Sequence, residues 1–297
     1  MMRPEHRRHR RPFRRRPVVR IRGLTINRLL PNILTTLALC AGLTAIRYAV
    51  HERWEQAVTA ILVAAVLDGL DGRVARLLRG SSKFGAELDS LADIVSFGVS
   101  PAIILYLWMM QYAGSLGWLA VMAYAVCAAL RLARFNTALD DTTLPPFAYN
   151  YFTGVPVPAG AILILMPVMI SFEFSSGFWV APLLVGLWTV FVALLLVSRI
   201  PTFSMKVVRI PQEYIVPVLV GIGLVATLLV TATWPTLVAL GLIYVGSIPF
   251  SIRRYAHLKR QAALMMGELD EEEAVPAAAA DSPAQQPPDR PDQPNAA

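Results

Sequence analysis

Cysteine, histidine and charged residues are scarce in this chain of 297 residues. Its two cysteines, Cys40 and Cys127, both fall in apolar segments, so we expect neither a structural disulfide nor a cysteine-ligated zinc site. The four histidines all lie outside the apolar segments, which argues against histidine chemistry in a membrane-embedded site. Charged residues make up 16% of the chain and hydrophobic residues 56%. This composition excludes an ordinary soluble domain and indicates a membrane protein.

Apolar stretches of about the 20 residues that a bilayer-spanning helix requires recur along the chain. The expected fold class is therefore all-α, a polytopic membrane helix bundle of about eight transmembrane helices. A short amphipathic piece, residues 24–30, is expected to lie in the membrane interface before the first span. The expected spans are residues 32–48, 55–79, 84–110, 116–134, 152–170, 177–198, 215–231 and 235–252.

The two ends of the chain differ from this membrane region. Residues 1–25 are predicted to be a basic, disordered arm, and residues 261–297 a disordered tail that is acidic and rich in Pro and Ala. Residues 26–260 then form the membrane-embedded domain. Because the basic arm precedes a span and holds no nucleic-acid-binding motif, we expect it to contact anionic lipid headgroups and not nucleic acid.

The basic residues also predict an orientation. Threading eight spans leaves Arg47 and Arg53 on the side opposite the N-terminus and the other 25 of the 27 Lys and Arg on the same side as it. The positive-inside rule then places both termini in the cytoplasm. We therefore expect a multi-pass protein of the inner (cytoplasmic) membrane whose second and third spans meet at the cytoplasmic face.

Four aspartates occur where those two spans meet. Asp68 and Asp71 are three residues apart and Asp89 and Asp93 are four apart, so on helices each pair shares one face. The glycine and serines of residues 79–84 are typical of a turn and a helix start, which predicts a helical hairpin with the pairs facing each other. An ionised Asp at membrane depth costs about 2.5 to 3.5 kcal/mol, so bound cations are expected. Oxygen ligands favour Mg²⁺, Mn²⁺ or Ca²⁺ over zinc, and two such ions can hold a phosphate group.

The spacing of these residues resembles the signature of the CDP-alcohol phosphotransferase family over about residues 26–160. That resemblance implies an integral-membrane enzyme that moves a substituted phosphate from a CDP-linked donor to an alcohol. It also implies two ions, Mg²⁺ or Mn²⁺, bound by the four aspartates, and Asp93 as the general base. The matching string is Asp68-x2-Asp71-Gly72-x2-Ala75-Arg76-x8-Gly85-x3-Asp89-x3-Asp93.

The resemblance further implies which residues contact the donor, CDP-diacylglycerol. Polar residues at the start of the first span are often only a helix cap, yet in the family an Asn-x2-Thr pair at this point lies against the nucleotide. The expected donor contacts are Asn32, Thr35, Gly72, Ala75, Arg76, Ser82 and Gly85.

A second string resembles the branch of the family whose acceptor is L-serine, which implies phosphatidylserine and CMP as products. It reads Arg131-Leu-Ala-Arg134-Phe-Asn136 and is followed by Gly154-Val-Pro-Val-Pro-Ala. The arginines are either snorkelling residues at the end of a span or anchors for an anion, the acceptor's carboxylate or the donor's diphosphate. Ser96 follows Asp93 by three residues and either lines the acceptor pocket or bonds its own helix backbone. The expected acceptor contacts are Ser96, Arg131, Arg134 and Asn136.

Other acceptors and one other class of protein compete with this interpretation. Choline would call for an aromatic cage, and glycerol 3-phosphate or a phosphorylated inositol compound for a denser basic pocket. A divalent-cation transporter would also bury carboxylates, but on several helices through both leaflets. We therefore expect a serine phosphatidyltransferase in phospholipid synthesis, and the family resemblance suggests a homodimer.

Overall fold

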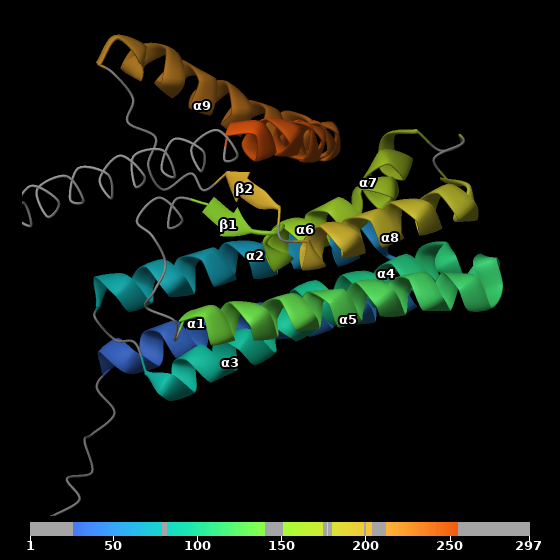
Figure 1. The fold of residues 1–297 in the computed structure, drawn as a ribbon, viewed down its shortest axis with the longest axis horizontal. Helices are drawn as coiled ribbons and strands as arrows, with labels where there is room; N and C mark the ends of the chain where they lie inside the picture. Colours follow the sequence, from blue (N-terminus) through green and yellow to red (C-terminus); the bar gives the residue numbers. More distant parts are fainter. Residues whose placement is uncertain are drawn as a thin grey trace, which may run out of the picture.

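The computed structural model describes residues 26–78, 82–139, 151–174, 177, 180–198, 200–203 and 212–254. The predicted arm, residues 1–25, and the predicted tail, residues 261–297, lie outside this part. The regular secondary structure of the described residues is helical except for one short pair of strands, and most helices run side by side along the long axis of the molecule (Figure 1). The helical fold expected from composition is thereby confirmed.

The first two spans form the most extensive helix pair. Helix α1 (Ile26–Val50) packs along α2 (Trp54–Leu77) through small residues such as Ala45, Ala57 and Ala64, which let the two backbones approach closely. From Ile26 onward, the amphipathic piece predicted for residues 24–30 is part of α1, and its position in the membrane interface stays a prediction. Pro31 lies in the second turn of α1, where its missing N–H removes one backbone hydrogen bond without ending the helix.

The third span consists of three segments joined end to end. Helix α3 (Lys83–Asp93) passes into a π-helical turn, η1 (Ile94–Val99), and then into α4 (Ser100–Trp108). A π turn widens the helix and shifts the register of every residue after it, and such turns are frequent at functional sites. Here the turn follows Asp93 directly, so residues after Asp93 no longer keep α-helical spacing with it.

The fourth to sixth spans surround the site from the other side. After the 3₁₀ turn η2 (Met110–Ala113) come α5 (Gly114–Leu139), α6 (Val157–Ile164), α7 (Met166–Glu173) and α8 (Pro182–Val197). The fifth span was expected to begin as helix at residue 152, which is wrong. Strand β1 (Tyr151–Thr153) instead pairs antiparallel with β2 (Pro201–Phe203). Gly154 adopts φ +77°, and its N–H donates a hydrogen bond to the carbonyl of Ile200 (2.8 Å). The chain therefore turns at Gly154, and α6 begins directly after its N-cap residue, Pro156.

The last two helices lie beside each other along one side of the bundle (Figure 1). A 3₁₀ turn, η6 (Gln212–Tyr214), precedes α9 (Ile215–Thr231), and the final helix is Thr233–Arg254. Their bounds differ by at most two residues from the predicted spans, because uninterrupted apolar runs flanked by polar residues define a span well.

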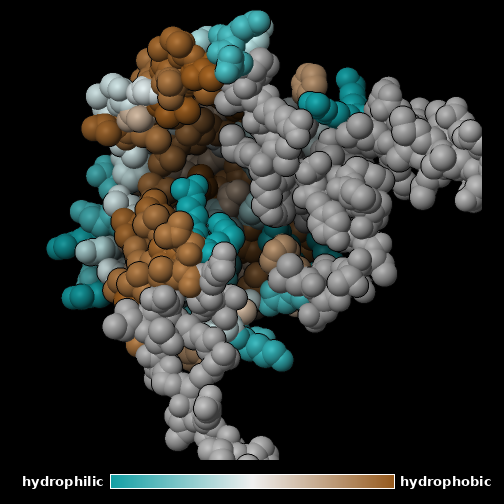
Figure 2. Space-filling view, turned by 90° about the vertical axis from the view of Figure 1, so that its left-hand side faces the viewer, coloured by the Kyte–Doolittle hydropathy of each residue, from teal (hydrophilic) through white to brown (hydrophobic). Residues whose placement is uncertain are grey.

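Five helical stretches of the described chain are long and apolar enough to cross a bilayer, which indicates a multi-pass membrane protein. Helix α2 has the length but carries acidic and basic side chains near its end, and Val157–Glu173 and Pro182–Val197 are apolar but shorter. Large hydrophobic side chains cover much of the described outer surface, seen as brown areas in Figure 2. The five stretches are Leu29–Val50, Lys83–Trp108, Met110–Thr137, Gln212–Thr231 and Thr233–Arg254.

Candidate active site

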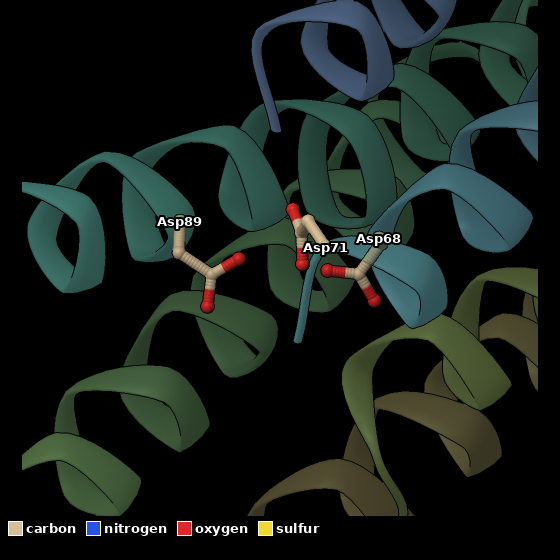
Figure 3. A group of neighbouring side chains, drawn as sticks. All are labelled: Asp68, Asp71 and Asp89. Carbon is tan, nitrogen blue, oxygen red and sulfur yellow. The ribbon is translucent and has the colours of Figure 1, made fainter. Parts of the chain in front are cut away.

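Three carboxylates from two helices meet at one point of the bundle. Asp68 and Asp71 project from α2 and Asp89 from α3, and one oxygen of each lies within 4.8 Å of the others. Figure 3 shows the carboxylates of Asp68 and Asp89 on either side of Asp71. Asp71 is buried, whereas Asp68 and Asp89 are half-buried. The face-to-face hairpin expected from the i, i+3 spacing therefore brings these three side chains together.

Asp93 lies next to this cluster, one helical turn beyond Asp89. It does not belong to the group of three mutually close carboxylates, but its side chain lies close to that of Asp68. The fourth aspartate of the signature therefore lies beside Asp68 of α2, at the point where α3 passes into the π turn.

The cluster has the chemistry of a divalent-cation site. All of its ligand atoms are hard carboxylate oxygens, which suit Mg²⁺ or Mn²⁺. Among the described residues, none of the four aspartates forms an ion pair with a basic side chain. Closely spaced acids at a half-buried position repel each other, so a bound cation would relieve a charge that this part of the chain leaves uncompensated.

A first cleft of about 240 Å³ opens on one side of the carboxylates, between α1, α2 and the start of α3. All seven residues that we expected to contact the donor line this one cleft. Its lining consists of Pro31, Asn32, Thr35, Asp71, Gly72, Ala75, Arg76, Ser82, Gly85, Ala86 and Asp89.

The start of α3 is shaped to keep this cleft open. Ser82 caps the helix, and its Oγ accepts a hydrogen bond from the N–H of Gly85 (3.0 Å). A Cβ at Gly85 would lie 2.7 Å from Oδ1 of Asn32 and 3.1 Å from Oγ of Ser82, so a larger residue there would displace these two polar side chains of the cleft. The first turn of α3 thus presents backbone N–H groups to a cleft that could take an anion.

A second cleft of about 310 Å³ lies on the other side of the carboxylates. The two clefts share Asp71, Gly72, Arg76 and Asp89, so the carboxylate cluster forms their common boundary. The sequence analysis did not include Pro156 and Pro158 among the site residues, although both belong to the string that follows Asn136. The second cleft is lined by Asp68, Gly69, Asp71, Gly72, Arg76, Asp89, Asp93, Arg131, Leu132, Phe135, Pro156, Val157 and Pro158.

Of the four expected acceptor contacts, Arg131 lines this second cleft and the other three do not. The Ser96 hydroxyl donates to the carbonyl of Ala38 on α1 (3.3 Å), because the π turn rotates it away from the face of Asp93. Arg134 donates from its two terminal nitrogens to the carbonyls of Val197 (2.8 Å) and Ser198 (3.3 Å).

Asn136 likewise makes a contact between helices. Its Nδ2 donates to Oγ of Ser90 on α3 (2.9 Å). Ser96, Arg134 and Asn136 thus contact other helices and do not line either cleft, and their part in acceptor binding stays a prediction.

Comparison with known proteins agrees with this architecture. Residues 28–197 match the family model described as CDP-alcohol phosphatidyltransferase, and residues 213–249 match the one described as CDP-alcohol phosphatidyltransferase 2. The chain is 41% identical over 232 residues to a CDP-diacylglycerol–serine O-phosphatidyltransferase of Mycobacterium tuberculosis strain H37Rv, covering 78% of this chain and 80% of that protein.

Two more distant relatives carry the same name. The proteins of Helicobacter pylori strain J99 and Bacillus subtilis strain 168 are 36% and 33% identical to this chain. The matches cover 66% and 58% of this chain and 81% and 88% of the relatives. By its sequence match over both halves of the bundle, the chain belongs to the CDP-alcohol phosphatidyltransferase family.

Proposed function

We propose that this chain transfers the phosphatidyl group of CDP-diacylglycerol to L-serine, forming phosphatidylserine and releasing CMP. One observation carries the proposal: two clefts of different lining meet at a single group of carboxylates, as a reaction between two substrates requires. The names of the relatives specify the substrates.

The first cleft is the proposed donor site. Asn32, Thr35, Gly72, Ala75, Arg76, Ser82 and Gly85 line it and would contact the CDP part of the donor. Arg76 and the N-terminus of α3 supply the positive potential that a diphosphate requires. The acyl chains of the donor would lie along the hydrophobic outer surface of the helices.

Asp68, Asp71, Asp89 and Asp93 are the proposed ligands of two divalent ions, Mg²⁺ or Mn²⁺. When bound, such ions supply Lewis-acid polarisation of the phosphoryl oxygens and stabilise the negative charge of the departing CMP. Asp71 is held for this role by the hydroxyl of Thr35, which donates to it from α1.

Asp93 is the proposed general base, because it lines the second cleft, from which the acceptor would approach. It would accept the proton of the serine hydroxyl as the serine oxygen forms a bond to the phosphorus that carries diacylglycerol. The bond between that phosphorus and the bridging oxygen breaks, and CMP leaves with the electron pair. The proton then passes from Asp93 to solvent, which restores the base.

The arrangement in the cell follows from the same proposal. We propose eight spans, counting α2 and the two shorter apolar stretches together with the five long ones. Under the positive-inside rule, both termini and the open ends of the clefts would then face the cytoplasm. A membrane-embedded domain of residues 26–260 and a homodimer complete the proposed organisation.

The test uses the purified full chain in lipid nanodiscs and measures CMP release from CDP-diacylglycerol. L-Serine, choline, glycerol 3-phosphate and inositol are offered in turn, with Mg²⁺, with Mn²⁺ and with excess EDTA. We expect CMP release with serine and either metal ion, and none with EDTA. Release with choline but not serine would overturn the acceptor, and metal-independent release would overturn the role of the cluster. Ion flux into vesicles without any transfer would favour a transporter.

A further inference from the structure

Arg131 is a buried cation whose guanidinium is incompletely paired. It projects from α5, is only 8% exposed, and its Nε has no hydrogen-bond partner. It forms no ion pair within the described residues, although Asp93 and Tyr244 lie in its surroundings. Removing a cation from water without pairing it costs several kcal/mol, so a side chain in this state calls for a partner that arrives from outside.

The second arginine of the motif, Arg134, shows the contrast. It sits nearly one turn further along α5, and both of its terminal nitrogens are bonded to carbonyls at the C-terminal end of α8. Those carbonyls lack helical partners of their own, so Arg134 caps α8 and fixes α5 against it. The two arginines of one short motif therefore have different roles, and only Arg131 is left to meet a ligand.

The position of Arg131 identifies the substrate that it faces. It lines the second cleft together with Asp68 and Asp93 and is absent from the lining of the first cleft, whereas Arg76 lines both. The second cleft thus has aspartates and Arg76 on the side of α2 and α3, and on the side of α5 it has Arg131, a basic residue that the first cleft lacks. This pattern complements a small zwitterion such as an amino acid better than it complements a neutral alcohol or a phosphate.

We propose that the guanidinium of Arg131 binds the α-carboxylate of the acceptor in the second cleft and thereby selects an amino acid over alcohols without a carboxylate. This inference rests on the proposed serine phosphatidyltransferase function. A planar guanidinium can hold both oxygens of a carboxylate, which would fix the acceptor with its hydroxyl turned toward Asp93.

The test compares wild type, Arg131→Gln and Arg131→Lys, with Arg47→Gln as the control at an exposed arginine outside both clefts. Acceptors are L-serine and L-serinamide, which differ only in the carboxylate, and L-alanine and L-alaninamide serve as unreactive competitors. We expect Arg131→Gln to lower kcat/KM for serine by about 100-fold, as loss of one partner of a buried charge pair does. It should leave weaker activity with serinamide unchanged, and Arg131→Lys should fall between wild type and Arg131→Gln.

Inhibition by L-alanine and L-alaninamide measures recognition of the carboxylate even if L-serinamide is not turned over. In wild type L-alanine should inhibit more strongly than L-alaninamide, and in Arg131→Gln the two should inhibit alike. The KM for CDP-diacylglycerol should stay at the wild-type value in every variant, and thermal unfolding of Arg131→Lys should match that of Arg47→Gln.

Two results would overturn the inference while the proposed function stands. One is a wild-type preference for L-alanine over L-alaninamide that persists in Arg131→Gln. The other is a raised KM for CDP-diacylglycerol, which would assign Arg131 to the donor. Absence of any CMP release with serine in wild type would instead refute the proposed function itself.

Discussion

The hydroxyl of Thr35 on α1 donates a hydrogen bond of 2.6 Å to Oδ2 of Asp71 on α2. Thr35 is 4% and Asp71 5% exposed, so little solvent reaches this contact. Thr35 also lies 3.1 Å from the carbonyl oxygen of Pro31 in the preceding turn. The first span therefore does more than border the donor cleft: it orients one carboxylate of the proposed metal site.

Replacing Thr35 by Val should weaken metal binding while preserving side-chain shape. Loss of a partner that orients a metal ligand typically costs about 10- to 100-fold in affinity or activity. We expect the Mg²⁺ or Mn²⁺ concentration needed for half-maximal CMP release to rise by a factor in that range. Thr35→Ser keeps the hydroxyl and should behave like wild type. An unchanged metal requirement in Thr35→Val would show that Asp71 is oriented without α1.

Asp93→Asn should remove the proposed general base while leaving the binding of one metal ion intact. Asn is close in size to Asp but cannot accept the serine proton, and loss of a general base costs about 10² to 10⁴ in rate. Because Asp93 is not one of the three mutually close carboxylates, tight binding of one Mn²⁺, measured by electron paramagnetic resonance, should survive. Asp71→Asn should lose that binding. A wild-type rate in Asp93→Asn would remove Asp93 from the role of base.

The sequence predicted the site residues that precede the π turn η1 better than those within it and after it. The spacing of Asp68, Asp71 and Asp89 and the donor residues depend on local helix geometry and one short turn, and the structure brings them together. Ser96 was misplaced because hydrophobic periodicity does not reveal one extra residue per turn.

The acceptor side depended on contacts that are distant in sequence. Arg134 bonds residues more than 60 positions away, and β1 pairs with a strand about 50 positions later. The Arg134 hydrogen bonds and the β1–β2 pairing decide which side chains line a cleft. Neither contact can be recognised from the neighbouring sequence. Two arginines of one motif look equivalent in sequence, and only the position of α8 distinguishes them.

Gly85→Ala should impair donor binding more than stability. The added methyl group would meet Oδ1 of Asn32 at 2.7 Å and displace this side-chain amide, which lines the donor cleft. We expect a raised KM for CDP-diacylglycerol, measured with serine saturating. Gly221→Ala on α9 is the matched control, since nothing lies within 4 Å of its new Cβ. Equal KM values for the two variants would contradict a tight contact at Gly85.

Tyr124→Phe should loosen the π turn that follows Asp93. Tyr124 is fully buried, and its hydroxyl donates to the carbonyl of Phe97 in η1 (2.8 Å). In a regular helix that carbonyl would accept from the residue four positions on, but this residue is Pro101, which has no N–H. The tyrosine hydroxyl thus replaces a backbone donor that the chain cannot supply.

Losing this bond leaves a buried carbonyl unsatisfied, which costs about 1 to 3 kcal/mol. Thermal unfolding in nanodiscs should show that loss, and kcat should fall because η1 begins directly after Asp93. Adding Pro101→Ala to Tyr124→Phe restores an N–H at the required position and should recover part of the stability. If Tyr124→Phe unfolds like wild type, or if Pro101→Ala deepens its defect, the carbonyl of Phe97 does not depend on Tyr124.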